Sequence, residues 1–421
     1  MLINYMKETE ILNILYEWNP WKKNLEVGIY RPYYIEKLKK LSKTNQIITL
    51  TGPRRSGKST ILKQFMQTIE NKESILYINF EESKFMTKDL NLVHKIYEIY
   101  RTNIFPKGKI NLFLDEVQNV EGWEKFVRSI HEKGDTKNIL ITASVSDFIS
   151  REYGNILTGR HIDLHVFPLN LKEFLEFKGI LTGEKNETVF KREEIINATK
   201  EYLVWGGFPK IVLNNEKKYL LSTYFNDIIN RDIIGKNKIN EYTKLNQLAY
   251  YYLSNSANLH SFNKISKFLK LSNDTVSRFS YFFEESYLFF FIKLFAYSLK
   301  KQNVNPKKVY CIDNGLIESE GFKFMQDADK RLENSVFLHL IYSGFSPFYL
   351  KNGFEVDFYI DDIAIQVCYE LNGSTEREIK ALKQTNAKEK LIITWNQEEN
   401  IEGIKVIPFW KWALDILNSS N

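Results

Sequence analysis

Short runs of apolar residues alternate with helically spaced apolar positions between residues 46 and 167. A strand that is buried on both faces is a continuous apolar run, whereas a covering helix has apolar residues three and four positions apart. The stretch from Trp123 to Ile130 has the helical spacing. The strand-like runs are residues 47–50, 75–80, 112–114, 139–141 and 162–167. This alternation predicts an α/β domain that is built on a parallel sheet.

The pattern changes after residue 167. Helical spacing prevails from residue 168 to about residue 230, with a break at the sequence Trp-Gly-Gly-Phe-Pro that begins at Trp205. A second helical cluster covers residues 242–288. Short strands return after Pro306, and they include residues 354–360 and 363–368. The carboxyl-terminal part therefore predicts helical segments followed by a smaller α/β domain.

The composition indicates a globular protein of the cytoplasm. Hydrophobic residues make up 43% and charged residues 26% of the 421 positions, which is typical of folded proteins. The two cysteines, Cys311 and Cys368, cannot form a disulfide scaffold and suit a reducing compartment. The amino-terminal segment has no apolar signal core, and the longest apolar run, residues 287–297, contains Lys293. We expect a cytoplasmic protein without a membrane segment.

Positive charge is concentrated in one part of the chain. The net charge is +6, and residues 231–308 hold 13 lysines and arginines against 5 acids. A basic block in an otherwise balanced chain favours a polyanionic partner such as nucleic acid. A solvated, lysine-rich face fits the same charge pattern equally well.

The most specific motif begins at Gly52 and matches the phosphate-binding pattern G-x-x-x-x-G-K-[ST]. It follows a predicted strand and opens a predicted helix, which is the context in which backbone N–H groups and a helix amino terminus bind phosphates. In this pattern Lys58 reaches the β and γ phosphates of ATP, and the hydroxyl of Ser59 ligates magnesium. The predicted nucleotide-binding residues are Gly52, Pro53, Arg54, Arg55, Ser56, Gly57, Lys58, Ser59 and Thr60.

An acidic pair ends the run of residues 112–114. Asp115 is expected beside Ser59, where its carboxylate holds Mg²⁺, a cation that prefers oxygen ligands. Glu116 is then placed to orient the attacking water and to accept its proton. Strand-terminal acids alone are common, but together with the phosphate loop they predict a nucleotide hydrolase.

An additional strand is predicted at residues 75–80, between the phosphate loop and the acids. This arrangement, together with the second acid, resembles that of P-loop ATPases that use a glutamate to hydrolyse ATP. Ser144, with Thr142, has the position of a polar sensor of the γ-phosphate, although capping hydroxyls fit nearly as well. Gln118 suits a contact to the attacking water or to the γ-phosphate, and a surface turn fits it equally well. Arg160 is expected to neutralise charge in phosphoryl transfer. If a neighbouring subunit supplies it, the chain forms a homo-oligomer, but a plain surface arginine is an equal alternative.

Seven segments in a fixed order resemble a large family of prokaryotic, chiefly archaeal, AAA-superfamily ATPases with a carboxyl-terminal domain of unknown function. They are Asn19-Pro20-Trp21, residues 52–60, residues 114–118, residues 159–169, Gly206-Gly207-Phe208-Pro209, Arg231-Asp232-Ile233 and residues 355–358. The resemblance covers nearly the whole chain. It implies a P-loop ATPase core at residues 1–167, a helical lid at 168–235, a winged helix at 236–305 and a nuclease-like domain at 306–421.

The basic block contains a pattern that fits a helix-turn-helix. A helix at residues 262–269 and a second one at residues 274–281 share apolar positions at the spacing of a common core. In a DNA complex Thr275, Ser277 and Arg278 would face the groove of duplex DNA. Phosphates would contact Lys264, Lys267, Lys300 and Lys301. A winged helix that only packs against other domains is the alternative.

The carboxyl-terminal segment resembles the PD-(D/E)xK nucleases, in which acids hold magnesium and a lysine helps to activate water. The matching positions are Glu333 on a predicted helix, Asp357 on one strand and Gln366 on the next. Cys368 stands where the lysine is needed, and a thiol cannot supply an ammonium group. We therefore expect a nuclease-like fold that has lost hydrolysis.

Taken together, the sequence predicts an AAA-type ATPase that binds ATP and Mg²⁺, hydrolyses ATP and couples hydrolysis to DNA or to a protein. The catalytic roles fall to Lys58, Glu116, Ser144 and Arg160, and the metal ligands are Ser59 and Asp115. The alternatives are a nucleotide-gated binding switch that hydrolyses slowly and an ATP-regulated nuclease.

Overall fold

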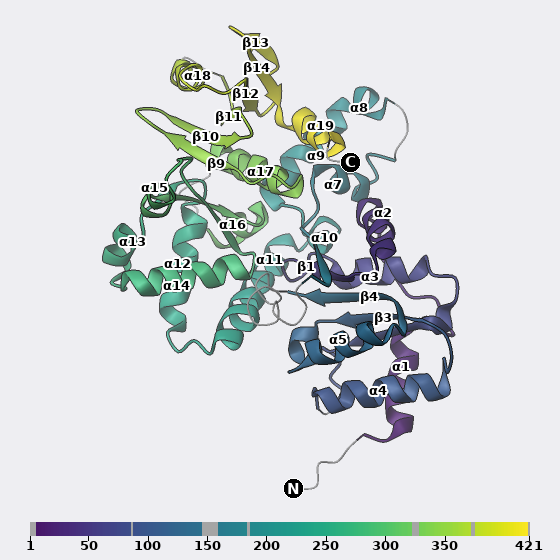
Figure 1. The fold of residues 1–421 in the computed structure, drawn as a ribbon. Coiled ribbons are helices and arrows are strands. Elements are labelled where there is room, and N and C mark those ends of the chain that lie inside the picture. The colour runs from purple at the N-terminus through teal and green to yellow at the C-terminus, as the bar shows by residue number, and fades with distance from the viewer. Residues whose placement is uncertain are drawn as a thin grey trace. The chain divides into compact units, whose positions relative to one another are not determined.

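The computed structural model describes residues 6–85, 87–144, 159–182, 186–321, 328–371 and 375–419. The chain forms two compact units, which divide between Val166 and Phe167 (Figure 1). Among the described residues, no helix combines the length and the apolar character that spanning a membrane requires.

The first unit is built around a five-stranded parallel sheet with the order β2-β3-β4-β1-β5. Its strands are β1 (Ile47–Thr51), β2 (Ile75–Asn79), β3 (Ile110–Asp115), β4 (Thr136–Ala143) and β5 (His161–His165). Its α-helices are α1 (Glu8–Trp18), α2 (Pro32–Leu41), α3 (Lys58–Gln67), α4 (Leu90–Asn103) and α5 (Trp123–Lys133), and its short 3₁₀ turns are η1 (Ser42–Thr44), η2 (Lys72–Ser74) and η3 (Val117–Asn119).

Each face of this sheet is covered by helices (Figure 1). One apolar core joins the sheet to α1, α4 and α5, and a second core joins it to α2 and α3. All residues of β1 and β3 are buried, which explains why these strands are continuous apolar runs in the sequence. The α/β class with a parallel P-loop sheet, expected from the sequence, is confirmed.

The edge strand β2 is closed by the segment that follows α1. The side chain of Asn19, which is fully buried, accepts a hydrogen bond from Tyr77 N and donates to Tyr77 O, at 2.7 and 3.0 Å. The indole of Trp21 donates to Ile75 O at 2.7 Å. These contacts satisfy peptide groups that an exposed edge would offer to another chain. The Asn-Pro-Trp segment therefore has a structural role at the sheet edge.

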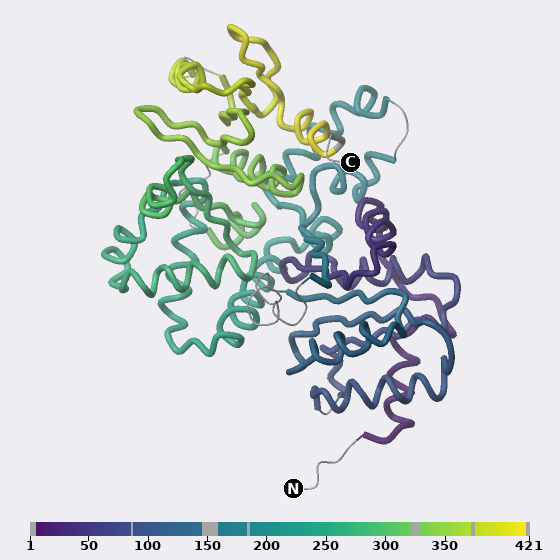
Figure 2. Tube along the Cα trace, in the orientation of Figure 1, coloured from purple at the N-terminus to yellow at the C-terminus, as the bar shows by residue number. Residues whose placement is uncertain are grey.

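The second unit contains most of the helices. They are α7 (Leu171–Phe177), α8 (Glu187–Phe190), α9 (Arg192–Trp205), α10 (Pro209–Val212), α11 (Lys217–Asp227), the π-helix η5 (Ile228–Gly235), α12 (Tyr242–Ser254), α13 (Phe262–Leu269), α14 (Asn273–Glu285), α15 (Leu299–Val304), α16 (Asn314–Glu320), α17 (Ala328–Tyr342), α18 (Glu376–Lys383) and α19 (Phe409–Ser419). Figure 2 traces this part of the chain from teal to yellow.

Two sheets complete the second unit. A small antiparallel sheet has the order β6-β8-β7, with β6 (Leu259–His260), β7 (Phe289–Ile292) and β8 (Lys307–Cys311). A larger mixed sheet has the order β13-β14-β12-β11-β10-β9. Its strands are β9 (Phe348–Lys351), β10 (Glu355–Ile360), β11 (Ile363–Val367), β12 (Glu389–Thr394), β13 (Glu399–Ile401) and β14 (Ile404–Pro408). The smaller carboxyl-terminal α/β sheet expected from the sequence is thus present.

A single apolar core extends through the three carboxyl-terminal domains that the sequence predicts. It includes Leu171 of α7, Phe279 of α14 and Trp412 of α19. These segments therefore pack as one unit, and the boundaries at residues 235 and 305 stay predictions.

The Gly-Gly-Phe-Pro segment binds a buried carboxylate within this unit. Gly206 has φ +71°, and a Cβ atom there would lie 1.8 Å from Oδ1 of Asp313. Gly207 N donates to Asp313 Oδ2 at 2.7 Å, and Gly207 O accepts from Leu169 N at 2.7 Å. Burial raises the pKa of Asp313 to about 7, although hydrogen bonds from the backbone N–H groups of Gly207, Gly315 and Phe208 oppose the shift. Only glycine fits both positions, so the motif depends on glycine to hold the buried Asp313 carboxylate in place.

A buried histidine connects α17 to α7. His339 is fully buried; Leu171 N donates to its Nε2 at 3.1 Å, and its Nδ1 lies 2.8 Å from Ser335 O. These partners require the neutral ring with its proton on Nδ1. Burial lowers the pKa of His339 to about 4.

Candidate nucleotide-binding site

The phosphate loop runs from the end of β1 at Thr51 to the start of α3 at Lys58. Gly52 has φ +145°, and a Cβ atom there would lie 2.1 Å from Val166 O. Gly57, with φ +102°, turns the chain into the helix. Sterics therefore require glycine at Gly52, and the positive φ favours glycine at Gly57. The loop stands between a strand and a helix, as the motif requires, and Thr60 lies in the first turn of α3.

Side chains within and around the loop hold it in shape. Lys58 is 4% exposed, and its Nζ donates to Gly52 O at 2.9 Å and to Pro53 O at 3.0 Å. Arg54 forms a 2.8 Å ion pair with Glu81, and Arg55 has φ +70°. Lys58 therefore ties the start of α3 to the loop backbone, and Arg54 ties the loop to Glu81.

Arg31 supports the loop from outside and was not predicted from the sequence. It is 2% exposed, and its Nη1 donates to Ser56 O at 2.9 Å. The hydroxyl of Ser56 is buried and has no hydrogen-bond partner among the described residues.

The two predicted metal ligands lie side by side. Ser59 Oγ donates to Asp115 Oδ1 at 3.0 Å. The same carboxylate accepts from the hydroxyls of Thr142, at 2.5 Å, and Tyr77, at 2.6 Å. This arrangement fixes an aspartate and a serine hydroxyl in contact, and oxygen donors of this kind suit Mg²⁺. Among the described residues, no group of three or more His, Cys, Asp and Glu side chains could hold a metal. The remaining ligands would have to come from phosphate oxygens and water.

Glu116 lies directly beyond β3, in the left-handed region with φ +54°. Its N–H donates to Thr142 Oγ1 at 2.9 Å, and its carboxylate accepts from the amide nitrogen of Gln118. The same nitrogen of Gln118 donates to Ser144 Oγ at 3.1 Å, whereas Gln118 Oε1 is buried without a partner among the described residues. Burial raises the pKa of Glu116, and the charge of Lys58 partly opposes this shift. The structure brings Glu116, Gln118 and Ser144 together.

Arg160 lies at the opposite end of the sheet from the phosphate loop. Its carbonyl accepts from Ile47 N at 2.9 Å, so it flanks the start of β1, whereas the loop follows the end of that strand. At about 3.3 Å per residue, the separation is on the order of 16 Å. Arg160 Nη2 forms a 3.4 Å ion pair with Glu132 of α5. The structure therefore does not bring Arg160 to the nucleotide site of its own chain.

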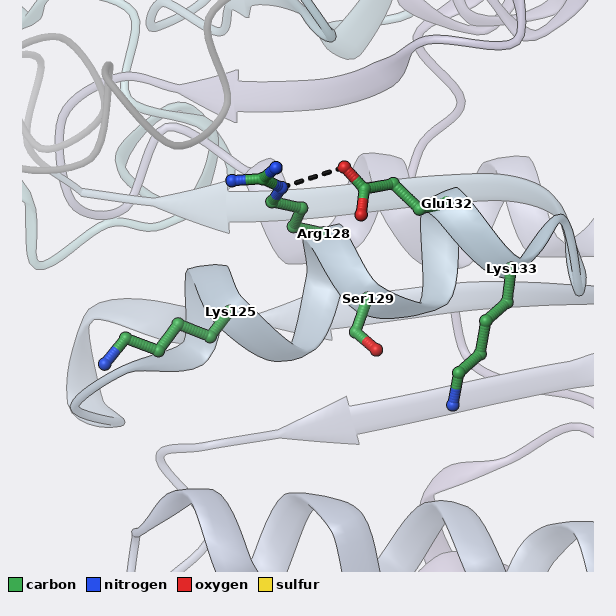
Figure 3. A pocket seen from close by; sticks show the side chains of 5 residues that line it. All are labelled: Lys125, Arg128, Ser129, Glu132 and Lys133. Atoms are coloured by element: carbon green, nitrogen blue, oxygen red, sulfur yellow. Dashed lines mark hydrogen bonds and ion pairs between the residues drawn. The ribbon is translucent and has the colours of Figure 1, made fainter.

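The outer face of α5 next to Arg160 is charged and open. Figure 3 shows Arg128 and Glu132 on one side of this helix, joined by an ion pair of 2.8 Å. A shallow pocket here is lined by Lys125, Arg128, Ser129, Glu132 and Lys133.

The residues predicted to contact DNA lie on α13, on α14 and in the segment between β7 and β8. Ser277 and Arg278 are exposed on α14, and Thr275 is half-buried. Arg278 lies 4.0 Å from Glu241. The lysines that were predicted to contact phosphates are exposed: Lys264, Lys267, Lys300 and Lys301.

The residues of the nuclease-like pattern lie on α17, β10 and β11. Asp357 N donates to Gln366 Oε1 at 3.4 Å, and both Glu333 and Asp357 contact Lys308 of β8. Cys368 follows β11, and burial raises the pKa of its thiol to about 12. Lys308 could not be predicted from the sequence pattern, because it lies 25 and 49 residues from the two acids.

Parts of this chain match two family models, and the chain is similar to several known proteins. Residues 44–175 match a family described as "AAA domain", and residues 196–321 match a "Domain of unknown function (DUF8612)". A Methanocaldococcus jannaschii protein described as uncharacterized is 34% identical over 401 residues, which is 88% of each chain. A Haemophilus influenzae protein with the same description is 30% identical over 405 residues, covering 92% of this chain and 98% of the relative. Among solved structures, a Walker-type ATPase of Pyrococcus abyssi aligns at 12% identity with a TM-score of 0.45, covering 69% of this chain and 95% of that one.

Proposed function

The chain belongs to the same family as the Methanocaldococcus jannaschii protein and contains an AAA-type P-loop ATPase domain, and on this premise we propose that it binds ATP with Mg²⁺ and hydrolyses it. The observation that carries this proposal is the contact between Ser59 and Asp115 beside the phosphate loop, with Glu116 next in the chain. The two free cysteines suit the cytoplasm as the place of action.

Each residue of the site has a defined task in this proposal. The loop N–H groups and Lys58 bind the phosphates, and Lys58 exchanges its two carbonyl partners for phosphate oxygens. Ser59 and Asp115 hold Mg²⁺, which withdraws charge from the phosphoryl group during transfer. Thr142 and Tyr77 fix the Asp115 carboxylate, so that it does not rotate away from the metal.

Glu116 acts as the general base. It accepts a proton from the attacking water, and its burial keeps the pKa above that of an exposed glutamate, closer to the pH at which it must work. Gln118 positions the Glu116 carboxylate through its amide nitrogen. The buried Gln118 Oε1 could accept a hydrogen bond from the same water. Ser144 lies on the other side of Gln118 and would contact the γ-phosphate.

Phosphate release with and without Lys58 tests this function. Lys58→Ala removes the charge that is aimed at the phosphates, so we expect tight nucleotide binding and steady-state hydrolysis to be lost. Lys63→Ala, a change on the same helix in a side chain that lies 5.2 Å from the ring of Trp18, is the matched control and should retain both activities. Equal hydrolysis in wild type and Lys58→Ala would refute the proposed site.

Arg160 is proposed to act in a neighbouring subunit. Its distance from its own nucleotide site and its position beside the open face of α5 favour a homo-oligomer in which it reaches the next site. The pair with exposed Glu132 does not oppose this, because surface ion pairs contribute about 0–1 kcal/mol. Arg160→Ala should bind ATP and lose about 10³-fold in turnover. Mixing it with Glu116→Gln should restore activity at hybrid interfaces, and a monomeric mass with ATP and no restoration would contradict this role.

Duplex DNA is the second proposed partner. The elements follow one another along the chain as α12, β6, α13, α14, β7 and β8, and β8 lies between β6 and β7 in the sheet, which supports a winged helix. Ser277 and Arg278 are exposed on α14, the second helix of the helix-turn-helix. If Lys300 and Lys301 contact phosphates, their replacement by Ala should reduce the slope of log affinity against log salt by nearly 2, at about 0.9 per contact. An unchanged slope would leave the alternative, a packing module in a nucleotide-gated switch.

A further inference from the structure

A buried lysine lies among three carboxylates in the second unit. Lys308 of β8 is 2% exposed. Its Nζ lies 2.7 Å from Asp357 Oδ1, 3.0 Å from Glu333 Oε1 and 3.2 Å from Glu355 Oε1. The acids come from α17 and β10, so the ammonium group joins β8 to two other elements of the fold.

Further hydrogen bonds orient these carboxylates toward the ammonium group. Tyr310 OH donates to Glu333 Oε1 at 2.6 Å, and Val367 N donates to Asp357 Oδ2 at 2.9 Å. Glu355, the most exposed of the three acids, is also paired with Lys351 at 3.2 Å. The three carboxylates are therefore held in place by other groups as well as by Lys308.

The charges in this cluster explain why the lysine stays protonated. Burial lowers the pKa of Lys308, but the charges of Asp357, Glu333 and Glu355 raise it by more, so its pKa lies above the ordinary value. Burial and the charge of Asp357 raise the pKa of Glu333, which Lys308 partly opposes. Buried charges of this kind persist only when they are paired.

The same acids without the lysine would attract a divalent cation. Mg²⁺ and Mn²⁺ bind carboxylate oxygens at about 2.0–2.2 Å, and two or three acids that converge on one point form such a site. The ammonium nitrogen already stands at the point where these oxygens converge. It contributes one positive charge, and its position leaves no room for a metal at those distances.

We propose that the Lys308 ammonium group occupies the place of a divalent cation, so that the carboxyl-terminal α/β sheet is a metal-free module joined to β8 by an internal cation. Lys308 does not replace the missing lysine of a nuclease, because it neutralises the acids that would have to hold the metal. The module therefore acts by binding or by packing, without phosphodiester hydrolysis.

Counting bound Mn²⁺ by electron paramagnetic resonance, on the full chain without nucleotide, tests this proposal. Each protein is compared with the same protein carrying Asp357→Asn, so that binding elsewhere cancels. At about 1 mM Mn²⁺ we expect no Asp357-dependent ion in the wild type and about one such ion per chain in Lys308→Ala. The Asp357-dependent affinity for Mn²⁺ should be at least tenfold higher in Lys308→Ala than in the wild type. Lys307→Ala, next to it on β8, with its Nζ 5.2 Å from the Phe262 ring, should behave as wild type.

A Mn²⁺ ion that wild type binds and Asp357→Asn loses would overturn the proposal, as would DNA cleavage with Mn²⁺ that disappears in Asp357→Asn. A folded Lys308→Ala or Lys308→Met that gains no Mn²⁺ would also overturn it. If neither variant folds, the wild-type count decides: absence of an Asp357-dependent ion supports the internal cation, and its presence refutes it.

Discussion

Asn19→Ala tests whether the segment after α1 closes the sheet edge through hydrogen bonds. The wild-type side chain makes three, to Tyr77 N at 2.7 Å, to Tyr77 O at 3.0 Å and to Leu15 O at 3.0 Å. Alanine removes all of them. Both Asn19 and Tyr77 are at most 1% exposed, so water has no ready access to the peptide groups of β2 that lose their partner.

The expected cost follows from those two peptide groups. A buried donor or acceptor that loses its partner costs about 1–3 kcal/mol, so the loss of two partners should lower the free energy of unfolding by roughly 2–6 kcal/mol. Urea unfolding, followed by tryptophan fluorescence and by circular dichroism, measures this change. Exposed Asn24 provides the control, because Asn24→Ala should change the free energy by less than about 0.5 kcal/mol. A loss below about 1 kcal/mol in Asn19→Ala would refute the role of these hydrogen bonds.

Three further changes test other parts of the structure. Burial lowers the pKa of His339 to about 4, so between about pH 6.5 and pH 4 the unfolded chain binds a proton on this ring that the folded chain does not bind. As the pH decreases through this window, His339 alone should lower the free energy of unfolding by about 1.4 kcal/mol per pH unit, and the difference between wild type and His339→Gln measures this contribution; an identical pH dependence in the two proteins would contradict it. Gly207→Ala places a Cβ atom 2.1 Å from Leu169 O, so thermal melting should show a loss of at least about 2 kcal/mol, and wild-type melting would contradict the model of a tight turn. Tyr77→Phe frees one oxygen of Asp115, and the Mg²⁺ concentration for half-maximal hydrolysis should shift at least about threefold while ATP binding stays; an unchanged Mg²⁺ dependence would exclude this positioning role.

Local patterns predicted the elements well. The apolar run of residues 47–50 lies in β1, Asp115 ends β3 with Glu116 directly after it, and the helix expected at residues 262–269 is α13. The apolar run of residues 287–295 contains the strand β7, and α15 lies in the connection from β7 to β8. Such features depend on neighbouring residues, whose spacing is visible in the sequence.

Contacts between distant residues could not be predicted in the same way. Nothing near Asn19 indicates that it pairs with Tyr77, because a sheet edge exists only after the strand order is set. Lys308 is one of many lysines in a basic segment, and its acids lie in other elements. The sequence likewise gave no sign that Gly206 and Gly207 would enclose Asp313. The residues of the phosphate loop were found because their chemistry depends on adjacent positions.

Single-turnover hydrolysis of ATP by wild type and Glu116→Gln, with nucleotide binding measured on the same samples, tests the central claim most directly. Glutamine keeps the size of the side chain but cannot accept the proton of the attacking water. We expect ATP affinity within about threefold of wild type and a hydrolysis rate lower by about 10²-fold or more. Hydrolysis at the wild-type rate by Glu116→Gln would contradict the assignment of the base and of the site around it.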